Sequence, residues 1–115
     1  MQKMNQERLQ IILMDEAMEF IESLPEATSY KIYYNMKRVA CGERNNELFK
    51  KLKNTEIWEF RTLHNKIAYR LFAFWDTDNN KLIIATHGII KKTSKTPLKE
   101  IAKAERIRNE YLKNK

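Results

Sequence analysis

Residues 67–75 read I-A-Y-R-L-F-A-F-W and form the segment that most restricts how this chain can fold. Apolar side chains occupy both its odd and its even positions, and Arg70 is its single charged residue. A strand buried on both faces has this pattern, whereas a strand with one solvated face alternates apolar and polar residues. We therefore predict that residues 67–75 are a central strand of a β-sheet.

Two further segments are typical of strands. Residues 57–63 (I-W-E-F-R-T-L) and residues 81–90 (K-L-I-I-A-T-H-G-I-I) are rich in apolar and β-branched residues. Residues 64–66 predict a tight polar connection, and residues 76–80 (D-T-D-N-N) predict a turn, because Asp and Asn cap their own backbone. In the first of these strands, one face carries Trp58, Phe60 and Thr62, and the other carries Ile57, Glu59, Arg61 and Leu63.

Helical spacing of apolar residues appears before and after these strands. We predict a first helix that follows an N-cap at Asp15 and is stopped by Pro25, then a second helix over residues 26–40 that ends near Gly42. A last helix opens at Pro97 and continues to about residue 112, since proline has no N–H to lose at a helix start. We expect its apolar stripe to contain Leu98, Ile101, Ala102, Ala104 or Glu105, and Ile107 or Arg108.

Three segments have weaker patterns. Residues 7–13 are either a first strand or the opening turn of a helix, and we favour the strand. The tyrosines of the second helix recur every three to four residues (Tyr30, then Tyr33 or Tyr34), which predicts a packing role. A short helical turn is expected to contain Leu48, Phe49 and Leu52.

Length and composition indicate one α+β domain over residues 1–115, in which two helices and a closing helix pack on an antiparallel meander. The hydrophobic fraction of 43%, with 2 Gly and 2 Pro, excludes collagen-like and wholly disordered chains. The single cysteine, Cys41, excludes an internal disulfide, and no Cys/His spacing suits zinc. Because no apolar run is long enough to span a membrane and no signal peptide is visible, we expect a soluble cytoplasmic protein.

The net positive charge of the chain comes from its second half. Residues 1–56 hold nine Lys/Arg and nine Asp/Glu, whereas residues 57–115 hold thirteen and six, so the whole excess of +7 lies after residue 56. A basic half indicates a polyanionic partner, usually nucleic acid, or an acidic protein that shields it.

Arg70 is the most informative single residue, because a buried guanidinium without a partner costs free energy. It must form an ion pair, with Glu59 or with the closing helix, or else open onto a surface that binds an anion. Arg61 is a second candidate for such a surface.

The basic run after the third strand supplies further candidates. Lys91 and Lys92 are consecutive, so only one of them can share the face of Arg70, and Lys95 follows in the same polar loop. His87 is either a packed structural residue or a proton-transfer group, since the ordinary pKa of histidine suits that chemistry.

Three motifs in order resemble the RelE/ParE toxin superfamily, and most closely its phage-derived, HigB-like branch. They are W-E-F-R at 58–61, Y-R-L-F-A-F at 69–74, and H-G-I-I-K-K-T-S-K-T-P at 87–97, followed by a basic closing helix. The resemblance covers residues 15 to about 110. It implies two N-terminal helices packed on a curved, mainly antiparallel sheet, with a C-terminal helix.

The resemblance also implies a function. Such a protein would be the toxin of a type II toxin–antitoxin pair and a ribosome-dependent mRNA endoribonuclease that acts in the 30S A site without metal or other cofactor. The cut would use the ribose 2′-hydroxyl as nucleophile. The partner would be a helix-turn-helix antitoxin that covers the basic surface, and operator DNA would be bound only through the antitoxin.

By the same resemblance, Arg61, Arg70 and Lys91 or Lys92 would hold the scissile phosphate, and His87 or a lysine with lowered pKa would transfer the proton. Some RelE-type enzymes use a tyrosine after the last strand, but this chain has none between Tyr69 and Tyr111, which leaves the general acid and base open. Further RNA contacts would come from Glu59, Lys66, Lys95 and Lys99.

Two other functions compete with this one. A ParE-type toxin would inhibit DNA gyrase without enzymatic activity, and ParE-like chains are also basic. A phage accessory protein would bind nucleic acid through the basic half, in a salt-sensitive manner and without effect on growth.

Overall fold

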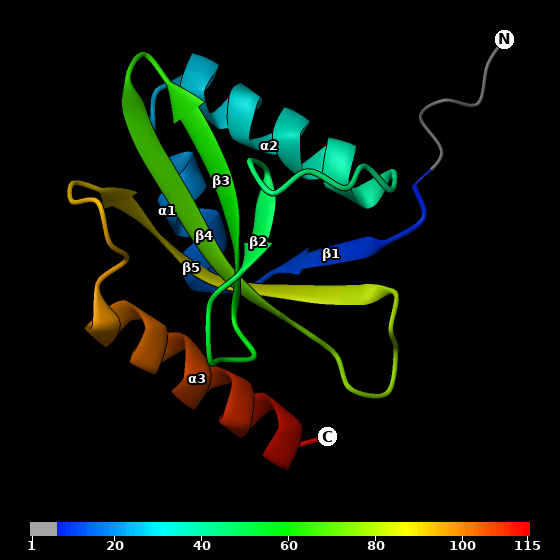
Figure 1. The fold of residues 1–115 in the computed structure, drawn as a ribbon. Coiled ribbons are helices and arrows are strands. Elements are labelled where there is room, and N and C mark those ends of the chain that lie inside the picture. The colour runs from blue at the N-terminus through cyan, green and yellow to red at the C-terminus, as the bar shows by residue number, and fades with distance from the viewer. Residues whose placement is uncertain (1–6) are drawn as a thin grey trace, which may run out of the picture.

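Within residues 7–115, five strands and three helices follow one another in the order β1-α1-α2-β2-β3-β4-β5-α3 (Figure 1). The structure is a computed structural model, and it describes residues 7–115. The strands are β1 (Gln10–Leu13), β2 (Phe49–Lys51), β3 (Trp58–His64), β4 (Ile67–Trp75) and β5 (Leu82–Lys91). The helices are α1 (Asp15–Glu22), α2 (Glu26–Ala40) and α3 (Leu98–Lys113).

The strands form one open mixed sheet in the order β1-β5-β4-β3-β2. β1 pairs with β5 in parallel, and every other pair is antiparallel. β4 therefore occupies the centre, as its two-sided apolar sequence predicts, and Phe72, Ala73 and Phe74 in it are fully buried. The strand predicted in residues 7–13 and the α+β class are both confirmed.

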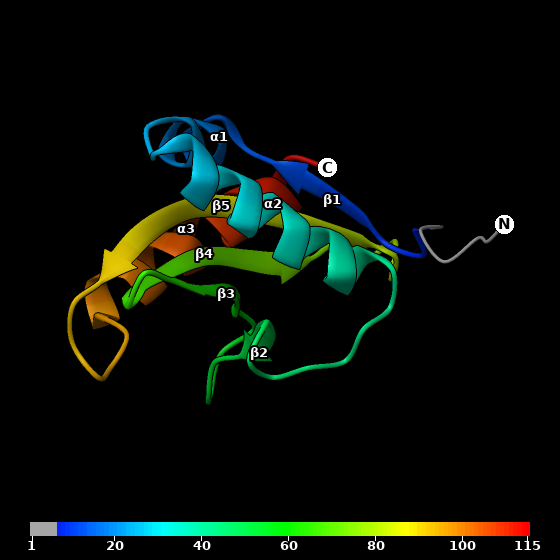
Figure 2. The same cartoon turned by 90° about the horizontal axis from the view of Figure 1, so that it is seen from above.

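The two faces of the sheet are covered by different helices (Figure 2). α1 and α2 pack on one face, where Ile21, Ile32 and Val39 belong to the same hydrophobic core as Phe60 and Leu71. On the other face, α3 covers a smaller core with Ala104 at its centre, which contains Ile57, Phe72, Phe74 and Ile84. Among residues 7–115, no helix combines the length and the apolar character needed to cross a membrane.

A β-bulge in β5 decides which of its side chains face α3. Ala85 pairs with Ala73 and His87 pairs with Phe72, so Thr86 is an extra residue in the strand. Because side chains alternate along a strand, the extra residue reverses the alternation. His87 and the odd-numbered positions after it consequently lie on the α3 face.

Two sequence predictions about local structure are wrong. The segment around Leu48 and Phe49 is not helical: residues 49–51 form strand β2, in which the Phe49 ring stacks on Phe60 at 4.4 Å between ring centroids. Pairing with β3 outweighs the local helical spacing. Asp15 is the first residue of α1 rather than its N-cap, and Met14 holds that place without a side-chain hydrogen bond.

Two packing predictions for the helices are also wrong. The tyrosines of α2 point to solvent, and Tyr30 is 71% exposed, because the opposite stripe of α2 with Ile32, Met36 and Val39 packs on the sheet. In α3, Leu98 is 81% exposed and Ala102 is exposed, since the contacts with the sheet begin further along the helix.

Candidate functional site

Neighbouring strands bring charged side chains together on the face of the sheet that α3 covers in part. Arg61 on β3 lies opposite Arg70 on β4, and Lys50 on β2 lies opposite Glu59. On β5, Ile89 pairs with Arg70, and Lys91, two residues later, lies on the same face. We call Lys50, Glu59, Arg61, Arg70 and Lys91 the cationic face.

Glu59 lies at the centre of the cationic face. Its Oε1 atom is 3.5 Å from Nε of Arg61 and 3.4 Å from Nε of Arg70, and its side chain is 3% exposed. Thr96, in the loop that leads into α3, donates a hydrogen bond of 3.0 Å from Oγ1 to Glu59 Oε2. The carboxylate thus holds two arginines close together although their like charges repel each other.

Arg70 keeps an unused hydrogen-bond donor at this site. Its Nη1 atom donates to the carbonyl oxygen of Tyr69 at 3.1 Å, but its buried Nε atom has no hydrogen-bond acceptor. Burial, with Arg61 nearby, lowers the pKa of Arg70 from its usual value. The predicted ion pair with Glu59 is present, although the Nε donor that faces the carboxylate makes no hydrogen bond to it.

Arg61 is less enclosed and is held from the loop before β2. Its Nη1 atom donates a hydrogen bond of 3.1 Å to the carbonyl oxygen of Asn46. Because Arg61 and Arg70 are partners in adjacent strands, their guanidinium groups approach the surface side by side. Two forked donors in this arrangement suit the oxygens of a phosphate group.

Lys91 is the lysine that shares this face, and Lys92 lies beyond the end of β5 and is exposed. Burial, followed by the positive charge of Arg70, lowers the pKa of Lys91 from its usual value, while Glu59 opposes the change. A lowered pKa increases the neutral fraction of the amine, which is the form that accepts a proton.

The charge balance of the cationic face favours an anion. Four cationic side chains surround the single carboxylate of Glu59, so three positive charges are in excess. Thr96 and Lys50 are part of this arrangement and were not predicted from the sequence. No local pattern identifies Lys50, because the three residues of β2 are too few to display alternation.

His87 lies on the same face of the sheet, but α3 covers it. Its Nδ1 atom is 2.8 Å from Oγ1 of Thr86, its Nε2 atom is 3.1 Å from Oε1 of Glu100, and its side chain is 2% exposed. Its ring also stacks on Phe72. Burial, helped by Lys103, lowers the pKa of His87, which favours the neutral imidazole.

The remaining predicted contacts lie around the cationic face rather than in it. Lys66 is the second residue of the β3–β4 turn, Lys95 lies in the loop before α3, and Lys99 is in the first turn of α3. All three are exposed. Within residues 7–115, no group of three or more His, Cys, Asp or Glu side chains is placed to hold a metal ion.

Comparison with known proteins gives both a family and a fold. The family described as phage-derived Gp49-like protein (DUF891) matches residues 19–109. The structure is similar to that of a RelE toxin mutant from E. coli in the free state, with a TM-score of 0.55 and 10% identity over 70% of this chain and 81% of that chain. No curated protein sequence matches the chain.

Two solved toxin–antitoxin complexes are also similar. For the RelBE2 complex of Mycobacterium tuberculosis, the TM-score is 0.52 with 15% identity over 73% of this chain and 99% of that chain. For the RelE–RelB complex of Pyrococcus horikoshii OT3, the TM-score is 0.52 with 17% identity over 76% and 99%. At such identities these likenesses establish that the fold is RelE-like.

Proposed function

The chain belongs to the family of phage-derived Gp49-like proteins, and from this membership, its RelE-like fold and its cationic face we propose that it is the toxin of a type II toxin–antitoxin pair. Its activity is endonucleolytic cleavage of mRNA. The observation that carries this proposal is the convergence of Arg61, Arg70 and Lys91 around one carboxylate.

In the proposed reaction the ribose 2′-hydroxyl attacks the adjacent phosphorus, the bond from phosphorus to the 5′-oxygen of the next nucleotide breaks, and that oxygen takes up a proton from water to become a 5′-hydroxyl. Arg61 and Arg70 stabilise the non-bridging oxygens, whose negative charge grows in the transition state. Glu59 orients both guanidinium groups, and its negative charge is exceeded by the cations around it.

Lys91 is our candidate for proton transfer from the 2′-hydroxyl, because it lies on the cationic face and its pKa is lowered. His87 takes part only if Glu100 and the first turn of α3 move away from it. Lys66, Lys92, Lys95 and Lys99 are proposed to bind the RNA backbone around the cut.

From the order of the motifs we propose that the chain belongs to the HigB-like branch and cleaves mRNA in the 30S A site of cytoplasmic ribosomes. Its partner is a helix-turn-helix antitoxin that covers the cationic face and alone binds operator DNA. The RelBE2 and RelE–RelB structures are complexes of a toxin with an antitoxin, which supports a protein partner of this kind.

Inducible expression without the antitoxin tests the proposal. We expect growth arrest and new transcript ends that carry a 5′-hydroxyl, both relieved by Arg70→Ala and unaffected by Arg106→Ala, which removes one exposed positive charge on α3. A folded Arg70→Ala protein that is still fully toxic contradicts the assignment of the site. Comparing the cleavage of free mRNA with that of ribosome-bound mRNA shows whether the activity requires the ribosome.

The ParE-type alternative makes a different prediction in the same cells. Gyrase inhibition would induce the DNA-damage response and leave transcripts intact. The matching solved structures are RelE proteins, so they do not favour this alternative.

A further inference from the structure

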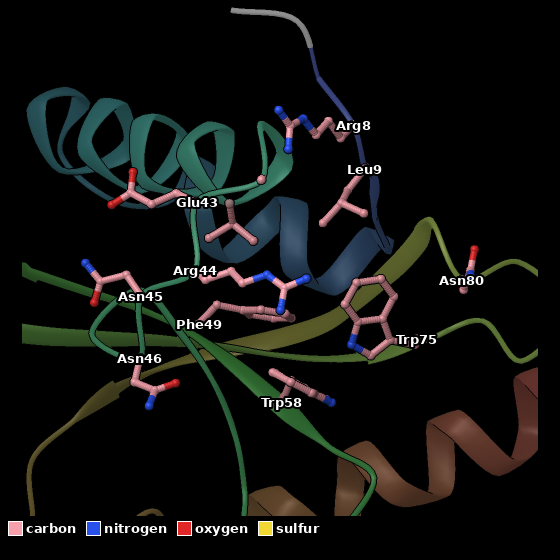
Figure 3. Close-up of a pocket in the computed structure, with 12 residues that line it drawn as sticks. Arg8, Leu9, Glu43, Arg44, Asn45, Asn46, Phe49, Trp58, Trp75 and Asn80 are labelled. Atoms are coloured by element: carbon pink, nitrogen blue, oxygen red, sulfur yellow. The ribbon is translucent and has the colours of Figure 1, made fainter. Parts of the chain in front are cut away.

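A cavity opens on the opposite face of the sheet from the cationic face, between the end of α2, the loop over residues 43–48, the start of β3 and the end of β4 (Figure 3). Its volume is about 690 Å³, within the usual range of small-molecule sites. None of the five residues of the cationic face lines it.

Aromatic rings form one wall of this cavity. Phe49 stacks on Trp58 with 4.8 Å between ring centroids, and Trp75 meets Trp58 edge to face at 6.2 Å. Phe49 is buried, whereas both tryptophans are only partly buried and direct ring surface into the cavity (Figure 3). Exposed ring faces beside a cavity are the usual platform on which a nucleobase stacks.

Arginines supply positive charge at the rim. Arg8 and Arg44 line the cavity and are exposed, and neither forms an ion pair with another described residue. The one acidic residue in the lining, Glu43, is already neutralised, since Arg38 donates two hydrogen bonds of 2.8 and 2.6 Å to its carboxylate. The rim therefore has two free cations and a satisfied carboxylate.

The cavity and the cationic face share one structural element. Residues 43–46 of the loop over residues 43–48 line the cavity, and the carbonyl oxygen of Asn46 accepts the hydrogen bond from Arg61. Trp58 and Glu59 are consecutive residues of β3 whose side chains point to opposite faces. A chain of nucleotides on the cationic face would reach the cavity by passing over the β2 edge of the sheet.

We propose that this cavity is a nucleotide-binding pocket, in which a base stacks on Trp58 and Trp75 and its phosphate is bound by Arg8 and Arg44. The ligand is either a free mononucleotide or one nucleotide of an RNA chain. The proposal goes beyond the nuclease activity and stands independently of it, because it concerns binding at other residues. A partner protein's side chain is the competing occupant.

The two tryptophans of the chain both line the pocket, so their indole N–H signals in an NMR spectrum report directly on it. We expect all four ribonucleoside monophosphates to shift both signals in a saturable way, because stacking accepts any base. Ribose 5-phosphate, which has no base, is expected to bind at least tenfold more weakly. Arg44→Ala and Arg8→Ala should each weaken mononucleotide binding about tenfold, and Arg106→Ala should leave it unchanged.

A short single-stranded oligoribonucleotide, titrated into the Arg70→Ala protein, separates the two sources of the ligand. Tighter binding of the oligonucleotide than of the mononucleotides assigns the pocket to an RNA chain, and equal binding assigns it to a free nucleotide. The proposal is overturned if no nucleotide shifts the indole signals, if Arg44→Ala binds normally, or if only a protein partner shifts them. These experiments measure binding and not toxicity, so their result does not depend on whether the proposed nuclease activity is correct.

Discussion

Arg70 and Glu59 form an ion pair in which Nε of the arginine lies 3.4 Å from Oε1 of the carboxylate and yet makes no hydrogen bond to it. Both side chains are at least nine-tenths buried. An ion pair with such a loose contact compensates only in part for the loss of hydration. The positive charge of Arg70 is therefore only partly compensated by Glu59 in the folded protein.

Replacing Glu59 separates RNA binding from RNA cleavage. In Glu59→Gln one negative charge leaves the cationic face, so we expect RNA to bind up to about tenfold more tightly at low salt, and less so at high salt. Cleavage should fall about tenfold or more, because the carboxylate no longer orients Arg61 and Arg70. Binding is measured by fluorescence anisotropy with a non-cleavable RNA.

The same substitution should lower the free energy of unfolding by about 1–3 kcal/mol, since it leaves a buried cation unpaired in a site open to solvent on one side. Glu105→Gln, an exposed carboxylate on α3, is the matched control and should change none of these quantities. Weaker RNA binding by Glu59→Gln would show that the carboxylate itself contacts the RNA favourably.

Lys91→Arg keeps the positive charge but removes the amine whose pKa is lowered in the folded protein. We expect RNA binding to change little and the cleavage rate to fall about 10²- to 10⁴-fold, the usual contribution of a general base. In the unmodified protein the rate should rise with pH as Lys91 deprotonates at its lowered pKa, and this rise should be absent in the variant. Single-turnover cleavage measured across pH provides the test.

Lys92→Arg is the neighbouring control, because Lys92 lies beyond β5 and is exposed. Its rate and its pH profile should match those of the unmodified protein. If Lys91→Arg retains the full rate, Lys91 serves only as a charge and another group accepts the proton.

Most of the fold follows from patterns in the sequence, because its strands and helices are long enough to repeat their period. The two-sided apolar run of β4 predicts a central strand, and Pro97 predicts where α3 begins. Strand β2 is missed because three residues are too few to display alternation, and its strand conformation depends on pairing with β3.

The composition of the candidate site is predicted only in part. The family resemblance implies that Arg61 and Arg70 act on one phosphate, and in the structure the two residues are partners in adjacent strands. The choice between Lys91 and Lys92 is not available from the sequence, because the bulge at Thr86 reverses the alternation of β5. The environment of His87 depends on Glu100 of α3, a tertiary contact that no local pattern indicates.

The buried imidazole of His87 should make the fold sensitive to acid. Its pKa is lowered in the folded protein, mainly by burial, with Lys103 adding to the effect and Glu100 and Glu16 opposing it. The unfolded chain therefore binds a proton first as pH falls below about 6.5. The contribution of the neutral imidazole to the free energy of unfolding is complete above that pH. It is lost progressively as the pH falls through the pKa of His87 in the folded protein.

We expect His87→Gln to flatten this dependence, and His64→Gln, at the β3–β4 turn, to leave it as in the unmodified protein. Urea unfolding at several pH values between about 7 and 5 measures the slope. A slope that is identical in His87→Gln and the unmodified protein would mean that the imidazole is protonated equally in both states.

Gly88, in the third motif, is predicted to serve packing rather than phosphate binding. A Cβ atom built on it would lie 2.7 Å from Cε2 and 2.8 Å from Cγ of Phe20 on α1, so Gly88→Ala forces the ring or the helix to move. The expected cost is about 1–3 kcal/mol of stability. In a Phe20→Ala background the same change should cost much less, and a double-mutant cycle by urea unfolding measures this coupling. If the losses of stability from the two substitutions simply add, the strain lies elsewhere. If they are coupled and RNA binding is unchanged, Gly88 serves the contact between β5 and α1.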